Sequence, residues 1–404
     1  MRSLHGLPSW LLLIGAMTAV GPVTIDMYLP GFPAIERDFG EQGVEKTMSA
    51  YLIGIAIGQL VYGPLSDRFG RKPPLYAGFT LYALGSLGCT LAPNMTILML
   101  MRVLQALGAC GGMVIGRAII RDRCEPHEAA RAFSILMAIV SLGPILAPSI
   151  GGIVVTAFGW RAVFVFQMLL AGLLLAAMHF VLTESRDPAA AKPLSMPAVA
   201  VDYHSLIRDR AFLGYTLAGA FGMAALFAYV TGAPAVLIER YGLSAQQFGW
   251  LLGVNGFAFM AASRINIVAL RKQTPAELLA KAVWVPALIG ALLTALTFAF
   301  AVPLWIFVGL QLAFFVSVAR VTPHAAALGL GPYGHIAGAA SAMMGALQSL
   351  IPMLVGFVLA AFHDGRPSTL AVMMTIGAIG GGLSYEWGKR GKGHELRATG
   401  HGQK

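Results

Sequence analysis

The sequence predicts an all-α polytopic membrane protein in which twelve transmembrane helices form two six-helix halves. Three observations carry this prediction. Of the 404 residues, 57% are hydrophobic and only 11% are charged, whereas a soluble domain carries about 25% charged residues. The apolar residues form continuous runs of about 20 residues, the length that a helix needs to cross a bilayer. A polar interval, residues 184–210, separates the first six runs from the last six.

The apolar runs do not alternate between polar and apolar residues, which favours helices over transmembrane strands. The glycine content, 48 residues, suits helices that pack closely in lipid. The first run is about 25 residues long and exceeds the core of about 7–15 residues in a cleavable signal peptide. In chain order we expect spans at 9–33, 47–65, 75–92, 95–117, 132–157, 161–183, 211–236, 246–270, 279–301, 303–326, 336–362 and 367–387.

The polar interval also defines the expected domains. They are an N-terminal six-helix half at 1–183, a cytoplasmic linker at 184–210, a C-terminal six-helix half at 211–387 and a polar, basic, disordered tail at 388–404. The loop after the second span of each half is basic, which is a weak internal repeat. Paired six-helix halves are one of the recurrent plans of transporters.

The distribution of Lys and Arg predicts the orientation of the chain. With the N-terminus inside, the cytoplasmic segments hold 21 of the 28 Lys and Arg residues and the outer loops hold five. The remaining two, Arg102 and Arg264, lie within spans. Because cytoplasmic loops carry the excess of positive residues, we expect both termini in the cytoplasm.

Several classes of protein are excluded. The scarcity of charge excludes a soluble enzyme, and the net charge of +10 does not indicate nucleic-acid binding because the basic residues lie in short loops. No spaced histidine cluster, paired intramembrane acids or nucleotide loop indicates a membrane enzyme. The three cysteines have no metal-binding spacing, so we expect no metal and no cofactor. A tail of 17 residues is too short for the signalling domain of a receptor. We expect a monomer, because one chain supplies both halves.

Charged residues inside the spans are the functional candidates. Asp26 is the one acidic residue that we place well inside a span, where a carboxylate costs roughly 2.5–3.5 kcal/mol on insertion scales. Arg102 lies in the fourth span. The first span exits near residue 34, eight residues after Asp26, and the fourth enters near residue 94, eight residues before Arg102, so their depths permit them to face each other. Gln105 shares the Arg102 face of the helix.

These three residues suggest a proton-coupled mechanism. Burial and a neighbouring arginine act in opposite directions on the pKa of a carboxyl group, and their balance can change as a cavity opens to either side. Asp26 would then carry a proton or bind a cationic group, and Arg102 and Gln105 would tune it. The alternative is a helix-to-helix hydrogen bond without a role in transport.

Arg264 and Arg320 have no acidic partner in their own half of the sequence. They suggest a patch of the substrate cavity for neutral, zwitterionic or anionic cargo, and Gln348 is a weaker polar candidate for the same cavity. The alternative for both arginines is that their side chains snorkel to the inner headgroups.

The segment after the second span resembles motif A of the major facilitator superfamily over eleven residues, Gly63 to Pro73. Gly63 would permit a close helix approach, Asp67 can serve a helix N-terminus, and Gly70 allows a tight turn. The resemblance implies a conformational latch rather than a substrate site. Its residues are Gly63, Asp67, Arg68, Gly70, Arg71 and Lys72.

Two further segments resemble motifs of the same superfamily. Arg102 to Gly108 is similar to motif B, with Ala106 in place of the usual glycine. The fifth span is similar to motif C, the antiporter signature of drug exporters, in which prolines bend the helix and glycines permit close packing. The residues of motif C are Gly143, Pro144, Pro148, Gly151 and Gly152.

Pro22 to Pro30 and Trp160-Arg161 resemble the Bcr/CflA group of multidrug exporters. This resemblance covers essentially the whole chain. It implies a proton antiporter of the bacterial inner membrane that exports small amphipathic antibiotics of the bicyclomycin or phenicol kind, with Tyr28 in the substrate cavity. A dedicated exporter of a single metabolite or self-made antibiotic is the alternative, and an uptake symporter is disfavoured by motif C.

Overall fold

The computed structural model describes the chain except residues 1–7, 125, 186–195, 363–364 and 400–404. The described residues form helices and no strand. The first part of the chain holds α1 (Ser9–Asp26), η2 (Leu29–Gly31), α2 (Phe32–Phe39), α3 (Glu45–Phe69), α4 (Lys72–Leu91), α5 (Met95–Arg123), α6 (Pro126–Ser141), α7 (Gly143–Phe158), α8 (Arg161–Val181) and α9 (Met196–Arg208). The second part holds α10 (Arg210–Pro234), the π-helical turn η4 (Ala235–Arg240), α11 (Ala245–Ala269), α12 (Pro275–Ala282), α13 (Val285–Ala299), α14 (Leu304–Leu330), η5 (Gly331–Ile336), α15 (Ala337–Ala361) and α16 (Pro367–Thr399).

Eleven helical segments of the described chain are long and apolar enough to cross a membrane. The remaining predicted span, 75–92, is α4, a helix of 20 residues. Its sequence includes Lys72, Thr80, Ser86 and Thr90, and these polar residues lower its mean hydropathy. The helices therefore agree with the predicted twelve-helix, all-α membrane fold.

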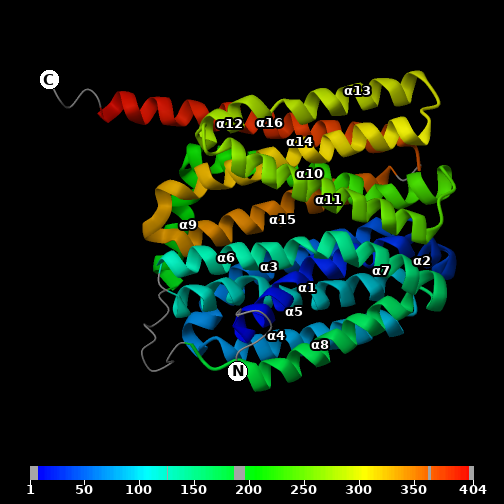
Figure 1. Cartoon of the computed structure of the whole chain (residues 1–404), viewed down its shortest axis with the longest axis horizontal. Coiled ribbons are helices and arrows are strands. Elements are labelled where there is room, and N and C mark those ends of the chain that lie inside the picture. The colour runs from blue at the N-terminus through cyan, green and yellow to red at the C-terminus, as the bar shows by residue number, and fades with distance from the viewer. Residues whose placement is uncertain (1–7, 125, 186–195, 363–364, 400–404) are drawn as a thin grey trace. The chain divides into compact units, whose positions relative to one another are not determined.

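The chain packs into two compact units. Unit 1 comprises Met1–Leu194 together with Pro234–Gly256, and unit 2 comprises Ser195–Ala233 together with Phe257–Lys404. Figure 1 shows the membrane-spanning helices of each unit lying side by side. The first part of α11 thus belongs to unit 1, whereas the predicted halves divide at 184–210.

Three predicted spans are interrupted in the structure. The span 9–33 breaks after α1, the span 132–157 breaks between α6 and α7, and the span 279–301 breaks between α12 and α13. A proline lies in the first turn after each break. Proline has no N–H to donate and suits the start of a helix. Apolar runs do not report such breaks, which is why the spans were predicted as continuous.

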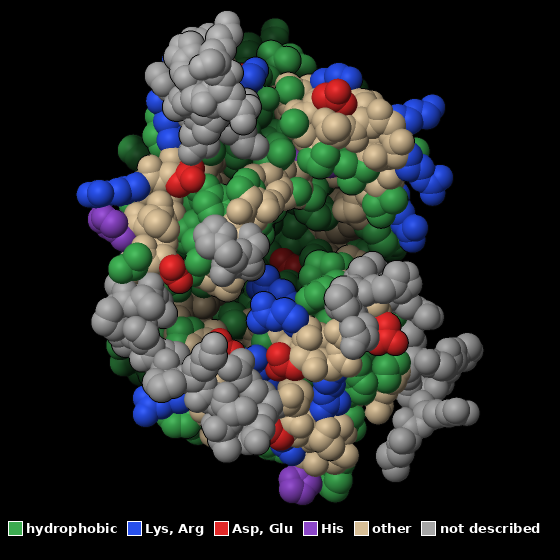
Figure 2. Space-filling view, turned by 90° about the vertical axis from the view of Figure 1, so that its left-hand side faces the viewer, with side chains coloured by type: hydrophobic (Ala, Val, Ile, Leu, Met, Phe, Trp, Pro, Cys, Tyr) green, Lys and Arg blue, Asp and Glu red, His purple; other side chains and the backbone are tan. Residues whose placement is uncertain are grey.

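Two polar segments are more helical than expected. The linker 184–210 contains α9, and α16 continues through Thr399, so the prediction that the tail 388–404 is disordered is wrong for its described residues. Figure 2 looks onto the helix ends on the side of α9 and shows Lys and Arg side chains on that face.

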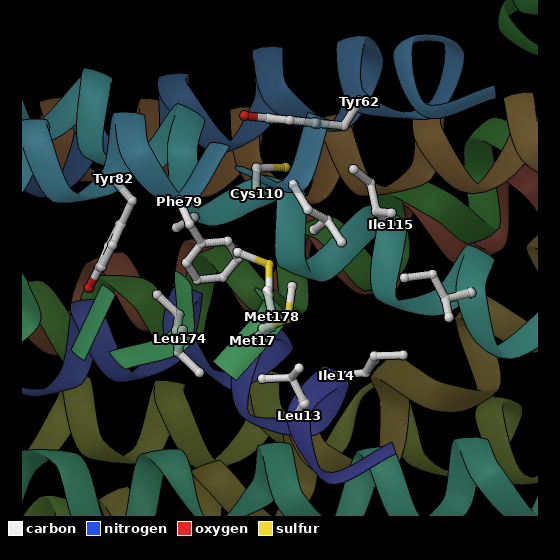
Figure 3. Packing of buried hydrophobic residues seen from close by; sticks show 14 of the residues in the cluster. Leu13, Ile14, Met17, Tyr62, Phe79, Tyr82, Cys110, Ile115, Leu174 and Met178 are labelled. Carbon is white, nitrogen blue, oxygen red and sulfur yellow. The ribbon is translucent and has the colours of Figure 1, made fainter. Parts of the chain in front are cut away.

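The core of unit 1 forms around α5, which packs against α3, α4 and α1. Small residues permit this packing, because a Cβ at Gly108 would collide with the α4 backbone and a Cβ at Gly54 would collide with α5. Met17, Phe79 and Met178, from three different helices, meet in this core (Figure 3). In unit 2, α13 packs against α14 and α16.

Candidate functional site

Asp26 is the last residue of α1 and lies at the break in the first membrane-spanning segment. At this break the Tyr28 N–H donates to the Ile25 carbonyl at 3.2 Å, which is three residues back rather than the four of an α-helix. The Asp26 side chain is half-buried. It forms no hydrogen bond or ion pair with any described residue.

Arg102 is completely buried inside unit 1 and is surrounded by aromatic rings. Its guanidinium carbon lies 4.3 Å from the ring centre of Tyr51, 4.6 Å from that of Tyr28 and 5.9 Å from that of Phe164. Its Nε has no hydrogen-bond partner. No carboxylate of a described residue lies within ion-pair distance, and Asp26 is not paired with it. Aromatic faces therefore stabilise the charge of Arg102.

The structure brings Gln105 to Arg102, as the three-residue spacing predicted. Arg102 Nη1 donates to Gln105 Oε1 at 2.7 Å. The Gln105 amide also donates to Ser86 Oγ and to Gln167 Oε1, each at 2.8 Å. All four side chains are fully buried. Tyr28 is also buried at 1% exposure, so in this structure it does not line an open cavity as predicted.

The motif A segment contains a second buried arginine, Arg71, which lies between the end of α3 and the start of α4. Its guanidinium donates to Asp67 and Asp122, each at 2.7 Å, and to Ser66 Oγ at 2.9 Å. Burial alone would lower the pKa of Arg71, but the hydrogen bonds and charges of Asp122 and Asp67 raise it above its ordinary value. Arg71 therefore stays charged and ties α3 to α5. Arg68 and Lys72 instead lie over the neighbouring rings of Phe69 and Tyr76.

The carboxylate at the N-terminus of α4 belongs to Glu184, which the sequence analysis missed. Its two oxygens accept hydrogen bonds from the backbone N–H groups of Arg71 at 2.8 Å and Lys72 at 3.0 Å, a favourable place for negative charge. Gly70 has a φ of 82°, as the predicted tight turn requires. The prediction for Gly63 is wrong in this structure, because a Cβ there would meet no atom within 4 Å.

The glycines of motif C pack α7 against two other segments of unit 1. A Cβ at Gly151 would collide with the Met27 carbonyl, immediately after Asp26, and a Cβ at Gly152 would lie 2.7 Å from the Ala245 carbonyl of α11. A Cβ at Gly143 would lie 3.4 Å from Val23 Cγ2 of α1, which is ordinary van der Waals contact. The prolines differ in role, because Pro144 starts α7 whereas Pro148 lies inside the helix. Motif C therefore packs directly against the break that holds Asp26.

The candidates in unit 2 are not brought together by any hydrogen bond. Arg264 is exposed on α11, and Gln348 is half-buried on α15, near Gly219. Arg320 on α14 has a buried Nε without a hydrogen-bond partner. His324, one turn further along α14, was missed, although it is 3% exposed and its Nε2 has no partner. The sequence signal that could have identified His324 is the position of a histidine inside an apolar run.

Other polar residues that the sequence analysis missed are buried in unit 1. Glu45, at the start of α3, is 2% exposed. It immediately precedes the apolar run that was assigned to the second span, so it was placed in a loop. Gln167 was overlooked as a single amide within an apolar run. Within the described residues, no group of three or more His, Cys, Asp or Glu residues is arranged to hold a metal ion.

The membrane helices, the paired units and the three motifs together define a class of protein, a multi-pass membrane transporter. The chain belongs to the Major Facilitator Superfamily, whose family profile matches residues 12–385. This superfamily comprises transporters of small molecules rather than enzymes. The chain is a multi-pass inner-membrane protein.

Similar proteins are known across bacteria. An uncharacterized transporter of this superfamily from Bacillus subtilis, YdgK, is 34% identical over 384 residues, which cover 92% of this chain and 93% of that protein. A bicyclomycin resistance protein homolog from Haemophilus influenzae is 30% identical, covering 91% of this chain and 92% of that protein. Among solved structures, a D-xylose-proton symporter has a TM-score of 0.73 at 18% identity, covering 94% of this chain and 97% of that chain, which shows a shared fold.

Proposed function

We propose that this protein exports small amphipathic drugs across the inner membrane in exchange for protons. The observation that carries the proposal is the 30% identity, over nearly the full length of both chains, to a protein named for bicyclomycin resistance. The resemblance of Gly143 to Gly152 to the antiporter motif supports export rather than uptake. Each elementary charge that crosses 100 mV supplies about 2.3 kcal/mol, so one proton per cycle supports a useful gradient.

In the proposed cycle, Asp26 alternately binds a proton and a polar group of the drug. Its position at the end of α1, without a partner among the described residues, supports this role. Arg102 carries a buried charge with no carboxylate at ion-pair distance in the described chain, and would favour the deprotonated form of Asp26 when the two approach. Proton and drug thus compete for one site.

The transport step is the rocking of residues 1–183 against 211–387, with motif A as a conformational latch and Arg264, Arg320 and Gln348 facing the drug. Both termini lie in the cytoplasm in this proposal, and the Lys and Arg residues visible on the α9 side in Figure 2 support that orientation. One chain forms the complete transporter, so the functional unit is a monomer.

Transport of radiolabelled bicyclomycin into inside-out proteoliposomes under an imposed pH gradient tests the proposal. We expect proton-driven uptake by the wild type, and a loss of about 100-fold or more with Asp26→Asn, because the carrier of the proton is removed. Asp38→Asn is the matched control. It removes an exposed carboxylate that is paired with Arg161, which is worth at most about 1 kcal/mol. Unchanged proton-driven uptake in Asp26→Asn would overturn the role of Asp26.

A change of cargo tests the residues of unit 2. Arg264→Ala is expected to alter transport of anionic or zwitterionic drugs by about tenfold while neutral drugs are affected less, because only a charged group gains from the guanidinium. Equal effects on all three classes would remove Arg264 from the substrate cavity.

A further inference from the structure

A chain of hydrogen bonds joins the buried Arg102 to the backbone next to Asp26. It runs from Arg102 Nη1 to Gln105 Oε1 at 2.7 Å, from Gln105 Nε2 to Gln167 Oε1 at 2.8 Å, and from Gln167 Nε2 to the Thr24 carbonyl at 3.4 Å. The three side chains are fully buried, and they lie on α5 and α8. The chain ends on α1, two residues before Asp26.

The Thr24 carbonyl needs this donor because the helix breaks there. In a regular α-helix it would accept from the Tyr28 N–H, but Tyr28 donates to Ile25 instead. A buried carbonyl without a hydrogen-bond partner is unfavourable, because it has lost its bond to water and gained none in exchange. Gln167 thus satisfies the carbonyl that the break leaves open, and stabilises the broken geometry of α1 beside Asp26.

The direction of the chain is fixed at both ends, by the Arg102 guanidinium and by the Thr24 carbonyl, which only accepts. A guanidinium only donates hydrogen bonds, so Gln105 must turn its carbonyl oxygen toward Arg102 and its NH₂ group toward Gln167. Gln167 must then turn its oxygen toward Gln105 and its NH₂ group toward Thr24. If Arg102 moves to a carboxylate, the Gln105 oxygen loses its donor, and only the Ser86 and Gln167 oxygens still hold the Gln105 amide in this direction. A reversed Gln167 would present an oxygen to the Thr24 oxygen, and the break would lose its donor.

We propose that Gln167 is a positioning residue for drug–proton exchange, which makes the geometry of the α1 break beside Asp26 depend on what Arg102 is bonded to. The inference rests on the proposed function, because it assigns a task in the exchange cycle. The amides of Gln105 and Gln167 could each be turned over, and an element with two discrete arrangements is what coupling between two sites requires. Arg102 and Asp26 are thereby linked without an ion pair between them.

Ser86 provides a matched control within the same network. Its hydroxyl accepts from the same Gln105 nitrogen at the same 2.8 Å, and it is as deeply buried as Gln167. Its hydroxyl donates to the Tyr82 carbonyl within α4 and does not continue the chain toward α1. Ser86→Ala therefore breaks a buried hydrogen bond of Gln105 without interrupting the path from Arg102 to Thr24.

The test compares Gln167→Met and Gln167→Glu with Ser86→Ala in proteoliposomes that transport radiolabelled bicyclomycin. Gln167→Met removes both bonds, and Gln167→Glu keeps an acceptor for Gln105 but no donor for Thr24. We expect both to lower turnover about tenfold or more with KM within about twofold of wild type. Ser86→Ala should leave turnover and KM within about twofold of the wild-type values. Wild-type turnover in the Gln167 variants, or an equal loss in Ser86→Ala, would overturn the inference. If Gln167→Met folds poorly, Gln167→Glu carries the comparison.

A second measurement separates this inference from the proposed function. Hydrogen exchange of the backbone amides of residues 24–28 needs no drug. It should be about fivefold faster in Gln167→Met than in wild type or Ser86→Ala, because the break has lost its donor. Unchanged exchange in Gln167→Met would overturn the inference whatever the substrate is. Failure of the wild type to transport bicyclomycin would overturn the proposed substrate. The hydrogen-exchange measurement would then still test the positioning role of Gln167.

Discussion

Arg71 and Arg102 are both almost completely buried in unit 1, at 1% and 0% exposure, but their surroundings differ. Arg71 is bonded to the carboxylates of Asp67 and Asp122, and lies where three helices end. Arg102 lies among aromatic rings and one amide, with no carboxylate of the described chain within ion-pair distance.

The difference distinguishes Arg71, whose charge is neutralised by carboxylates, from Arg102, whose charge has no carboxylate partner in the described chain. A neutralised guanidinium holds helices together, and removing it leaves uncompensated carboxylates. A buried guanidinium without a counter-charge keeps its capacity to attract one, which in the proposed cycle is Asp26 or an acidic group of the drug. In the proposed account, the same residue type, equally buried, therefore serves stability at one end of unit 1 and transport in its interior.

The largest effect on stability that would test this comparison is expected for Arg71→Met. It leaves two carboxylates without their partner, and breaking a buried ion pair costs about 3–5 kcal/mol. We expect a clear fall in the apparent Tm of the purified protein in detergent. Arg68→Met, three residues earlier in the last turn of α3 and exposed, is the control and should change the Tm little. Equal Tm values for both variants would contradict the structural role of Arg71.

A smaller effect distinguishes the two carboxylates of Arg71. The Asp122 side chain is 19% exposed and accepts two hydrogen bonds from Arg71, whereas the Asp67 side chain is 47% exposed and accepts one from it. Asp122→Asn should therefore cost about 1.5–3 kcal/mol and Asp67→Asn less than about 1 kcal/mol. Thermal unfolding of the two variants side by side measures this, and the reverse order would show that the Asp67 pair dominates.

The smallest change in stability is expected for Arg102→Met. Replacing a buried, unneutralised charge by an apolar side chain of similar length should alter stability by no more than about 1 kcal/mol, or should stabilise the protein. Drug transport should nevertheless be lost. Destabilisation as large as that of Arg71→Met would mean that Arg102 has a neutralising partner, and the comparison between the two arginines would fail.

The sequence predicted the membrane fold because a run of about 20 apolar residues has few alternatives to a spanning helix. The pairing of Arg102 with Gln105 was also predictable, since residues three apart share a helix face. The tight turn at Gly70 followed from its place in motif A. These features depend on spacing along one segment of the chain.

The features that sequence reasoning missed depend on contacts between segments. Glu184 reaches the N-terminus of α4 from more than 110 positions along the chain, and Gln167 reaches Thr24 from 143 positions away. No periodicity reports such contacts. The break after Asp26 was missed because its apolar residues continue without interruption, although Pro30 offered a local signal.

Competition between proton and drug at Asp26 is the central claim, and the release of protons on drug binding tests it most directly. Bicyclomycin is added to the purified protein in weakly buffered detergent solution, and the pH is recorded. We predict that drug binding to the wild type releases protons into solution, that Asp26→Asn releases none, and that Asp38→Asn behaves as the wild type. The account would be contradicted if the wild type bound bicyclomycin without releasing protons. It would also be contradicted if Asp26→Asn released as many protons as the wild type.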